Sequence, residues 1–257
     1  MSALLEIREA TKVFGGLTAV NKVSFDVKQG QIVGLIGPNG AGKTTVFNLI
    51  TGNYRADGGT ITFDGRSLAG LRTHRIVQLG IARTFQNIRL FQQLSAVENV
   101  LAGRHCRTGA GALAAMLRLP GQRREEREAA ERAAAELSFV GLRGQAMELA
   151  RNLSYGNQRK LEIARALATD PRLVILDEPA GGMNENETEE LIGLIRRIQA
   201  RGITVLLIEH DMSLVMKACE NIVVLEYGAR IAMGPPEAVK QDRRVIEAYL
   251  GTDEELA

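Results

Sequence analysis

The feature that most constrains the fold is a glycine-rich loop, GPNGAGKTT at residues 37–45, which follows an apolar run and precedes a helical pattern. The run IVGLIG (32–37) has the length and composition of a buried strand, and residues 43–50 repeat their apolar side chains at helical spacing. A loop between a strand and a helix presents backbone N–H groups at the helix N-terminus, where anions bind. The sequence therefore predicts an α/β fold with a phosphate-binding loop.

The loop fits the pattern G-x-x-x-x-G-K-[ST] through Gly37, Gly42, Lys43 and Thr44. We expect its N–H groups to surround a β-phosphate, Lys43 to reach the β and γ oxygens, and the Thr44 hydroxyl to bind Mg²⁺. The alternative is a glycine-rich turn with a solvated lysine, but spacing and strand–helix context together favour the phosphate site. The residues predicted to contact the phosphates are Gly37, Pro38, Asn39, Gly40, Ala41, Gly42, Lys43, Thr44 and Thr45.

Short β-rich segments come first in the chain, and strand and helix patterns alternate at its end. LLEIRE, then VSFDV after a loop, then ITFDG (61–65) predict a β subdomain, with a tight turn at KQGQ (28–31). After residue 153, the strands LVILD (173–177) and TVLLIE (204–209) alternate with helices and are followed by a hairpin at 222–234. This order predicts a mostly parallel sheet covered by helices.

The middle of the chain, from about 87 to 152, lacks strand patterns and shows helical spacing, which predicts a helical subdomain. Within it, Glu128 and Arg132 are placed for an ion pair one turn apart. The insertion at 103–125 has weak periodicity and is expected to contain a mobile loop. We expect one domain over 1–257, with 1–86 and 153–240 forming the core and its β subdomain, and 241–257 a short tail.

Composition narrows the function classes. The formal net charge is +2, from 32 Lys and Arg and 30 Asp and Glu, so no basic excess argues for nucleic-acid binding. The two cysteines, Cys106 and Cys219, lack metal-ligand spacing, which argues against a zinc site and fits a reducing compartment. No apolar run approaches the roughly 20 residues of a membrane helix, and the N-terminus lacks a signal-peptide pattern. We expect a cytoplasmic protein.

Two acids end the strand at 173–177. Beside a phosphate loop, Asp177 can hold the Mg²⁺ shell and Glu178 can polarise a water for attack on a γ-phosphate. Solvated acids at a strand end are the alternative, and the upstream loop favours the catalytic interpretation. His210 follows the strand at 204–208 at the same sheet edge, and Gln86 ends a strand at the start of the helical subdomain. The Gln86 amide can touch the metal or the attacking water.

These motifs occur in the order and roughly the spacing of the nucleotide-binding subunit of ABC transporters, which the chain resembles over nearly its whole length. The resemblance implies a P-loop NTPase core, with ATP and Mg²⁺ as cofactors. It also implies catalytic roles for Lys43, Gln86, Glu178 and His210, and metal contacts from Thr44, Gln86 and Asp177. Phe14 matches the aromatic that stacks on adenine in that family, and a strand-end aromatic is the alternative.

The stretch LSYGNQRKLEIARAL (153–167) resembles the signature helix of the family. In that family, this helix faces the P-loop of a second subunit in a head-to-tail dimer, so the resemblance implies that Ser154 and Gly156 contact the partner's ATP. The alternative for Ser154 is a plain helix cap, and for Tyr155 a core aromatic. Tyr155 stands where the usual pattern has its first Gly, Asn157 where it has Gln, and Asn184 where most members carry Asp.

These departures, the 103–125 insertion and the ending VIEAYLG resemble the ATPase subunits of branched-chain amino acid importers. Urea or amide importers and lipopolysaccharide exporters are related alternatives. The resemblance implies as partners a second ATPase subunit, identical or paralogous, transmembrane permease subunits and indirectly a substrate-binding protein, at the cytoplasmic face of the inner membrane. The rivals from other classes are a soluble ABC ATPase of translation or DNA repair and a nucleotide sensor without hydrolysis; the single ATPase half and the intact catalytic motifs argue against them.

Overall fold

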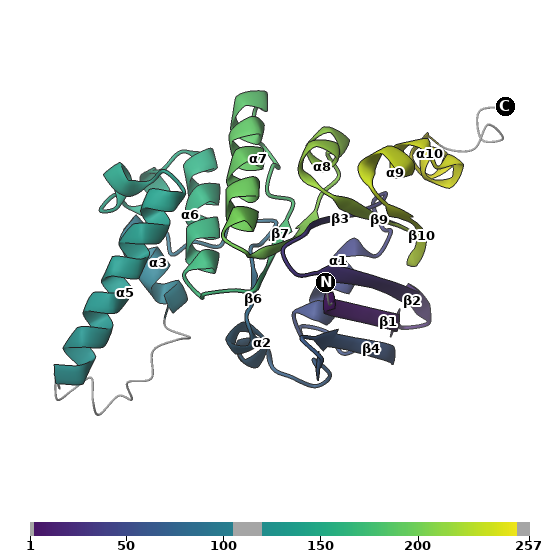
Figure 1. Cartoon of the computed structure of the whole chain (residues 1–257), viewed down its shortest axis with the longest axis horizontal. Coiled ribbons are helices and arrows are strands. Elements are labelled where there is room, and N and C mark those ends of the chain that lie inside the picture. Colours follow the sequence, from purple (N-terminus) through teal and green to yellow (C-terminus); the bar gives the residue numbers. More distant parts are fainter. Residues whose placement is uncertain (1–2, 105–119, 251–257) are drawn as a thin grey trace.

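The structure, a computed structural model, describes residues 3–104 and 120–250 and contains two sheets (Figure 1). The larger sheet has six strands in the order β10-β9-β3-β8-β7-β6. Neighbouring strands are parallel, except that β10 pairs antiparallel with β9. Its strands are β3 (Ile32–Ile36), β6 (Ile81–Arg83), β7 (Leu173–Asp177), β8 (Thr204–Ile208), β9 (Asn221–Glu226) and β10 (Ala229–Gly234).

Helices cover the large sheet and build the left-hand part of the molecule in Figure 1. α7 and α8 lie above the sheet in this view, and α3, α5 and α6 lie side by side beyond its β6 edge (Figure 1). The helices are α1 (Lys43–Ile50), α2 (Thr73–Leu79), α3 (Ala96–Arg104), α5 (Pro120–Phe139), α6 (Tyr155–Leu167), α7 (Glu185–Ala200), α8 (Met212–Ala218), α9 (Pro236–Gln241) and α10 (Arg243–Leu250), with short 3-10 turns at Arg143–Gln145 and Ala150–Asn152.

The central strands are apolar because both of their faces are covered. Every residue of β3, β7 and β8 is buried. Along β7, Val174 and Leu176 join the cluster that includes α6, α7 and α8, whereas Leu173 and Ile175 join the cluster that includes α1 and the smaller sheet. This two-sided burial explains the unbroken apolar runs and brings the carboxyl ends of the parallel strands to one edge.

The smaller, antiparallel sheet has the order β2-β1-β4-β5. Its strands are β1 (Ala3–Phe14), β2 (Leu17–Lys28), β4 (Gly58–Phe63) and β5 (Arg66–Ser67). The loop predicted between LLEIRE and VSFDV is wrong, because β1 and β2 continue as one long hairpin. Irregularities in the β1–β2 register near Glu9 and Lys22, whose φ angles are 48° and 47°, break the alternation that identifies a strand in the sequence.

The helical part differs from expectation in one ion pair. Glu128 does not pair with Arg132; its carboxylate lies 2.9 Å from Nε of Arg124, one turn earlier. Arg132 instead reaches Asp170, 3.3 Å away, because α5 packs alongside α6 and the loop after it. Of the predicted 103–125 loop, residues 105–119 lie outside the described residues, and so does Cys106. No helix within 3–104 or 120–250 is both long and apolar enough to cross a bilayer.

Candidate nucleotide site

The phosphate loop joins β3 to α1, and its geometry requires glycine at two positions. Gly37 has a φ of 149°, and a Cβ there would lie 2.1 Å from the Leu225 carbonyl oxygen. Gly42, the N-cap of α1, has a φ of 96°, and a Cβ there would lie 2.5 Å from the Ala19 carbonyl oxygen. Among the described residues no side chain caps α1, so its first N–H groups are left for an anion.

Lys43 lies inside this loop. Its side chain is 7% exposed, and Nζ donates to the carbonyl oxygens of Gly37, at 2.6 Å, and Pro38, at 2.9 Å. Burial lowers the pKa of Lys43, while the carboxylates of Glu178 and Asp177 oppose that shift. The other loop residues follow the same path: Ala41 is buried, Pro38 and Thr45 are half-buried, and Asn39, Gly40 and Thr44 are exposed.

Asp177 is the last residue of β7 and is 7% exposed. Burial, followed by the neighbouring charge of Glu178, raises the pKa of Asp177 to about 6. A buried carboxylate of this kind is stabilised by a cation, and carboxylate and hydroxyl oxygens are the ligands that Mg²⁺ prefers. No group of three or more Asp, Glu, His or Cys in the described ranges could hold a metal alone. The carboxylate of Asp177 and the hydroxyl of Thr44 are donor types that suit Mg²⁺ when nucleotide phosphates and water complete its ligands.

Glu178 follows β7 directly, and the side chains of Gln86 and His210, both predicted as site residues, lie beside its carboxylate. Gln86 donates from Nε2 to Oε2 at 2.8 Å, and Nδ1 of His210 lies 3.7 Å from Oε1. The backbone N–H of Glu178 donates to the Ile208 carbonyl at 2.8 Å, and its φ is 45°. Residues other than glycine rarely adopt this backbone conformation. The hydrogen bond to the neighbouring strand thus holds Glu178 in a strained position at the sheet edge.

The prediction that Gln86 ends a strand is wrong. β6 ends at Arg83, and only the N–H of Thr84 continues its pairing, donating to Ile175 at 2.9 Å. The carbonyl groups of Phe85 and Gln86 accept hydrogen bonds from the buried guanidinium of Arg159 instead. This side chain draws the segment off the sheet and leaves the Gln86 amide free to reach Glu178.

Glu209, directly after β8, is a further buried acid of the site that the sequence motifs do not predict. It is 1% exposed, and its Oε1 accepts from the Ala180 N–H at 3.0 Å. Its Oε2 accepts from the N–H groups of His210, at 3.1 Å, and Asp211, at 3.4 Å. Burial raises the pKa of Glu209, while these N–H groups oppose the shift. The available signal was an acid at the end of the otherwise apolar strand TVLLIE.

The start of α6 combines a cap with an exposed surface. Ser154 is the N-cap, and its hydroxyl accepts from the Asn157 N–H at 3.4 Å. Tyr155 is 46% exposed, so the core-aromatic alternative is wrong. The Asn157 side chain donates to Oε1 of Gln145 at 2.9 Å, so this amide is held within its own chain.

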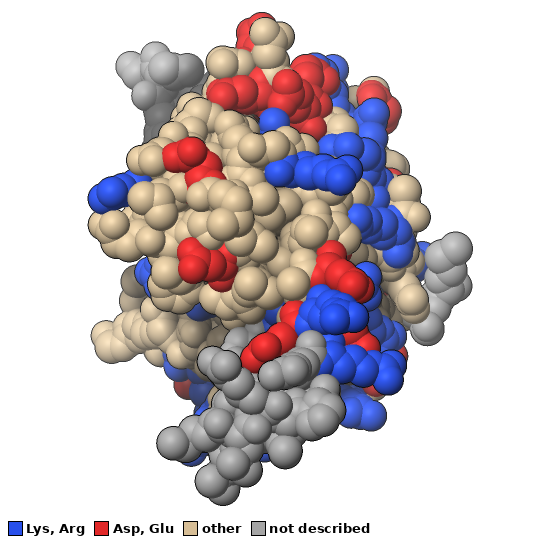
Figure 2. All heavy atoms as spheres, turned by 90° about the vertical axis from the view of Figure 1, so that its left-hand side faces the viewer, with Lys and Arg blue, Asp and Glu red and all other residues tan. Residues whose placement is uncertain are grey.

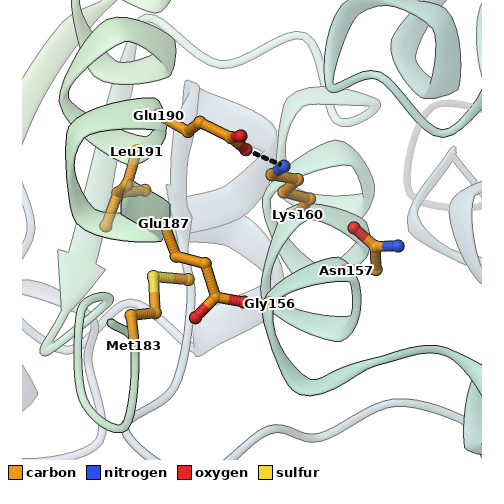
Figure 3. A pocket seen from close by; sticks show the side chains of 7 residues that line it. All are labelled: Gly156, Asn157, Lys160, Met183, Glu187, Glu190 and Leu191. Atoms are coloured by element: carbon orange, nitrogen blue, oxygen red, sulfur yellow. Dashed lines mark hydrogen bonds and ion pairs between the residues drawn. The ribbon is translucent and has the colours of Figure 1, made fainter. Parts of the chain in front are cut away.

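The starts of α6 and α7 pack against each other, as Figure 3 shows. A Cβ at Gly156 would lie 2.7 Å from Oε1 of Glu187, so glycine permits this approach. Glu187 and Asn184 form a reciprocal cap of α7, with two N–H···O bonds of 3.0 Å. Gly156 and Glu187 line a cavity of about 270 Å³, spanned by the 2.6 Å ion pair of Lys160 and Glu190 (Figure 3). Asn184 thus has a structural role as a helix cap.

Phe14 is the last residue of β1 and its ring is partly open. The side chain is 40% exposed, and the ring meets Tyr54 edge-on with centroids 5.1 Å apart. Nζ of Lys12 lies 5.2 Å from the Phe14 centroid. A flat, half-exposed ring of this kind can stack on a base, and its place at the strand end also fits the alternative.

Known proteins are similar to this chain over nearly its whole length. The sequence pattern of the family described as ABC transporter matches residues 20–181, and that of the branched-chain amino acid ATP-binding cassette transporter matches residues 229–255. The chain is 49% identical to the high-affinity branched-chain amino acid transport ATP-binding protein BraF of Pseudomonas aeruginosa, over 96% of this chain and 98% of that protein. It is 46% identical to the corresponding LivG protein of Escherichia coli, with the same coverage.

Solved structures show the same fold. A nucleotide-free ATP-binding cassette from an ABC transporter has a TM-score of 0.85 and 31% identity, covering 98% of this chain and 100% of that one. The ADP conformation of such a cassette has a TM-score of 0.85 and 30% identity, with the same coverage.

A relative of a different stated function is less similar in sequence. The lipopolysaccharide export system ATP-binding protein LptB of Acidithiobacillus ferridurans is 36% identical to this chain, over 98% of both chains.

Proposed function

Because this chain belongs to the ABC transporter family, we propose that it is the ATP-hydrolysing subunit of an importer that closes on a second ATPase subunit when it binds Mg·ATP. The observation that carries the proposal is the placement of the Glu178 carboxylate. It lies at the sheet edge beside the phosphate loop, between the Gln86 amide at 2.8 Å and the His210 imidazole at 3.7 Å. A carboxylate held in this way is a general base for a water that attacks a phosphate.

In the proposed reaction, the N–H groups after Gly37 and the ammonium of Lys43 hold the β- and γ-phosphates. Asp177 and Thr44 would hold Mg²⁺, which when bound neutralises charge on the phosphate oxygens. Glu178 takes the proton of the attacking water, while the Gln86 amide holds one carboxylate oxygen of Glu178 in place. The γ-phosphate leaves as inorganic phosphate, and ADP remains at the loop.

The proposed second nucleotide contact lies at the start of α6. Ser154 is exposed, so a phosphate of a facing subunit can approach its hydroxyl and the N–H groups of the first turn, whereas Gly156 is buried and lies against Glu187 of α7. Residues 180–184, which lead from the catalytic acid to Asn184, would line the same interface. Head-to-tail closure of two such subunits gives two nucleotide sites, each shared by both chains.

We place the membrane subunits against a hollow of about 400 Å³ beside the Gln86 loop, lined in part by Phe85, Arg89, Phe91 and Arg165. Arg89 lies over the Phe85 ring, 4.6 Å from its centroid, so the hollow presents cations on aromatic surfaces. Figure 2 views the molecule from the side of the helical part and shows basic and acidic side chains interspersed around a largely uncharged area. A protein segment that carries both apolar and acidic groups would suit the hollow. The protein would then lie peripherally at the cytoplasmic face of the membrane.

Branched-chain amino acids are the proposed substrates of the complete transporter. The support is the 49% identity to a relative of that stated function and the match of residues 229–255 to the corresponding family pattern. No residue of this chain is proposed to touch the transported molecule. Uptake of radiolabelled leucine by vesicles holding the complete transporter tests this step, and uptake of urea in its place would contradict it.

The ATPase proposal is tested with Glu178→Gln. This change keeps the shape and removes the base, so ATP affinity should stay within about threefold of wild type while turnover falls at least about 100-fold. Phosphate release and equilibrium ATP binding are measured in parallel. Glu237→Gln, at an exposed acid of α9, is the matched control and should hydrolyse normally. Wild-type turnover by Glu178→Gln would remove the residue from its proposed role.

A further inference from the structure

Tyr155, the residue that replaces a glycine of the usual signature, contacts a buried arginine of its own helix. Its hydroxyl lies 3.1 Å from Nη2 of Arg159, one turn later in α6. The Cζ atom of Arg159 lies 5.5 Å from the centre of the Tyr155 ring. A glycine at position 155 could make neither contact.

Arg159 carries the contact to the Gln86 loop. Its side chain is 3% exposed, and Nη1 donates to the Phe85 carbonyl at 2.6 Å while Nη2 donates to the Gln86 carbonyl. Nη1 also donates to Oε2 of the buried Glu162 at 3.3 Å, and the other oxygen of this carboxylate faces Arg165. A planar guanidinium that bonds two consecutive carbonyls fixes the path of that backbone.

Gln86 completes the connection, because its side chain donates to Glu178 at 2.8 Å. Unbroken hydrogen bonds therefore run from the first residue of α6 to the proposed catalytic acid. Tyr155 also lies against the segment that follows this acid: a Cβ at Gly182 would lie 3.3 Å from Cε1 of the tyrosine ring. Tyr155 thus contacts the segment after Glu178 directly and the Gln86 loop through Arg159.

We propose that Tyr155 and Arg159 are positioning residues that link the start of α6 to Gln86 and through it to Glu178. The inference rests on the proposed function, in which the start of α6 binds a facing subunit's nucleotide. Arrival of that nucleotide at the first turn sets the orientation of Tyr155 and Arg159. Through the two carbonyl bonds, this orientation sets the position of the Gln86 amide on Glu178. Hydrolysis in one site is thereby tied to the seating of the other nucleotide.

The test is a double-mutant cycle between Tyr155→Phe and Gln86→Ala, measured on the full-length chain assembled with its transporter partners. Tyr155→Phe keeps the ring against Gly182 and removes only the hydroxyl. It should lower kcat roughly fivefold with KM for ATP unchanged within about twofold. In the Gln86→Ala background the same change should have no further effect on kcat, because the connection is already broken. Tyr227→Phe, at an 89% exposed tyrosine, is the matched control and should leave kcat unchanged.

A second variant checks the arginine. Arg159→Lys keeps the charge, but an ammonium lacks the fork that bonds both carbonyls, so kcat should fall at least as far as in Tyr155→Phe. Thermal unfolding of Arg159→Lys shows whether this variant folds. If it does not fold, the double-mutant cycle with Tyr155→Phe alone decides whether the proposed connection exists. A Tyr155→Phe effect of equal size with and without Gln86, or no effect at all, would overturn the inference. If Gln86→Ala alone hydrolyses at the wild-type rate, the proposed mechanism at Glu178 fails instead.

Discussion

Two helices of this protein begin at places suited to a phosphate, and they differ in what their own chain supplies. The start of α1 has a glycine N-cap with a φ of 96°, no side-chain cap, and the buried ammonium of Lys43 beside it. The start of α6 has an exposed Ser154 whose hydroxyl bonds weakly to the Asn157 N–H at 3.4 Å. The first place has a loop, a cation and nearby carboxylates, whereas the second offers N–H groups and the Ser154 hydroxyl, with the Glu187 carboxylate packed against Gly156. The difference indicates one complete site and one half-site.

The largest expected effect comes from removing the cation of the complete site. Lys43→Ala should weaken ATP binding at least about 1,000-fold, because the buried ammonium is the one positive charge that the loop itself supplies to the phosphates. Equilibrium binding of a fluorescent ATP analogue measures it. Lys240→Ala, at an exposed lysine of α9, serves as control and should bind normally. Retained binding in Lys43→Ala would remove the distinction between the two helix starts.

The second effect concerns the half-site. Ser154→Ala should leave ATP binding by the isolated chain unchanged and lower the ATPase rate of the assembled transporter about 100-fold, because the hydroxyl is proposed to serve only the facing subunit's nucleotide. Loss of the cap should also cost about 1 kcal/mol of stability. Binding and turnover are measured separately. Weakened ATP binding by the isolated chain would show that Ser154 belongs to its own site.

The sequence predicts those parts of the structure whose determining contacts lie within one short segment, and it misses those that depend on residues far apart in the chain. The predicted helix at 43–50 matches α1 to the residue, because a strand, glycines and apolar spacing all lie within one short segment. The β1–β2 hairpin was missed, because irregular register hides the alternation. The site motifs lie at one sheet edge as expected, but their roles stay predictions. The bond that Arg159 donates to the Gln86 carbonyl and the bond that the Ala180 N–H donates to Glu209 join residues 73 and 29 positions apart, and no local pattern encodes them.

The buried carboxylate of Asp177 gives the complete site a pH dependence of stability that can be measured. Folding raises the pKa of Asp177 from 3.8 to about 6, chiefly by burial. A carboxyl group shifted upward stabilises the fold while it is protonated, so this contribution is full below about pH 4 and is lost as the pH rises through 6. The amide introduced by Asp177→Asn does not titrate. Without nucleotide or Mg²⁺, the free energy of unfolding of Asp177→Asn minus that of wild type should therefore increase by about 2 kcal/mol from pH 4 to pH 7.5. Urea unfolding at both pH values measures it, and a constant difference would contradict it.

The smallest expected effect tests whether Glu209 holds together the loop that leads to the proposed interface and the loop that carries His210. Glu209 accepts from Ala180 with one oxygen and from His210 and Asp211 with the other. A glutamine has a single acceptor oxygen, so Glu209→Gln must turn its NH₂ group towards N–H groups on one side. One of the two loops then shifts: the loop that leads to Asn184 and the proposed interface, or the loop that carries His210. We expect kcat to fall roughly tenfold while ATP affinity stays within about twofold, because neither loop belongs to the phosphate loop. Glu220→Gln, at an exposed acid just before β9, is the control. A Glu209→Gln protein that hydrolyses normally would mean that the two loops are held independently, and the connection from the half-site to Glu178 would then run through Tyr155, Arg159 and Gln86 without Glu209.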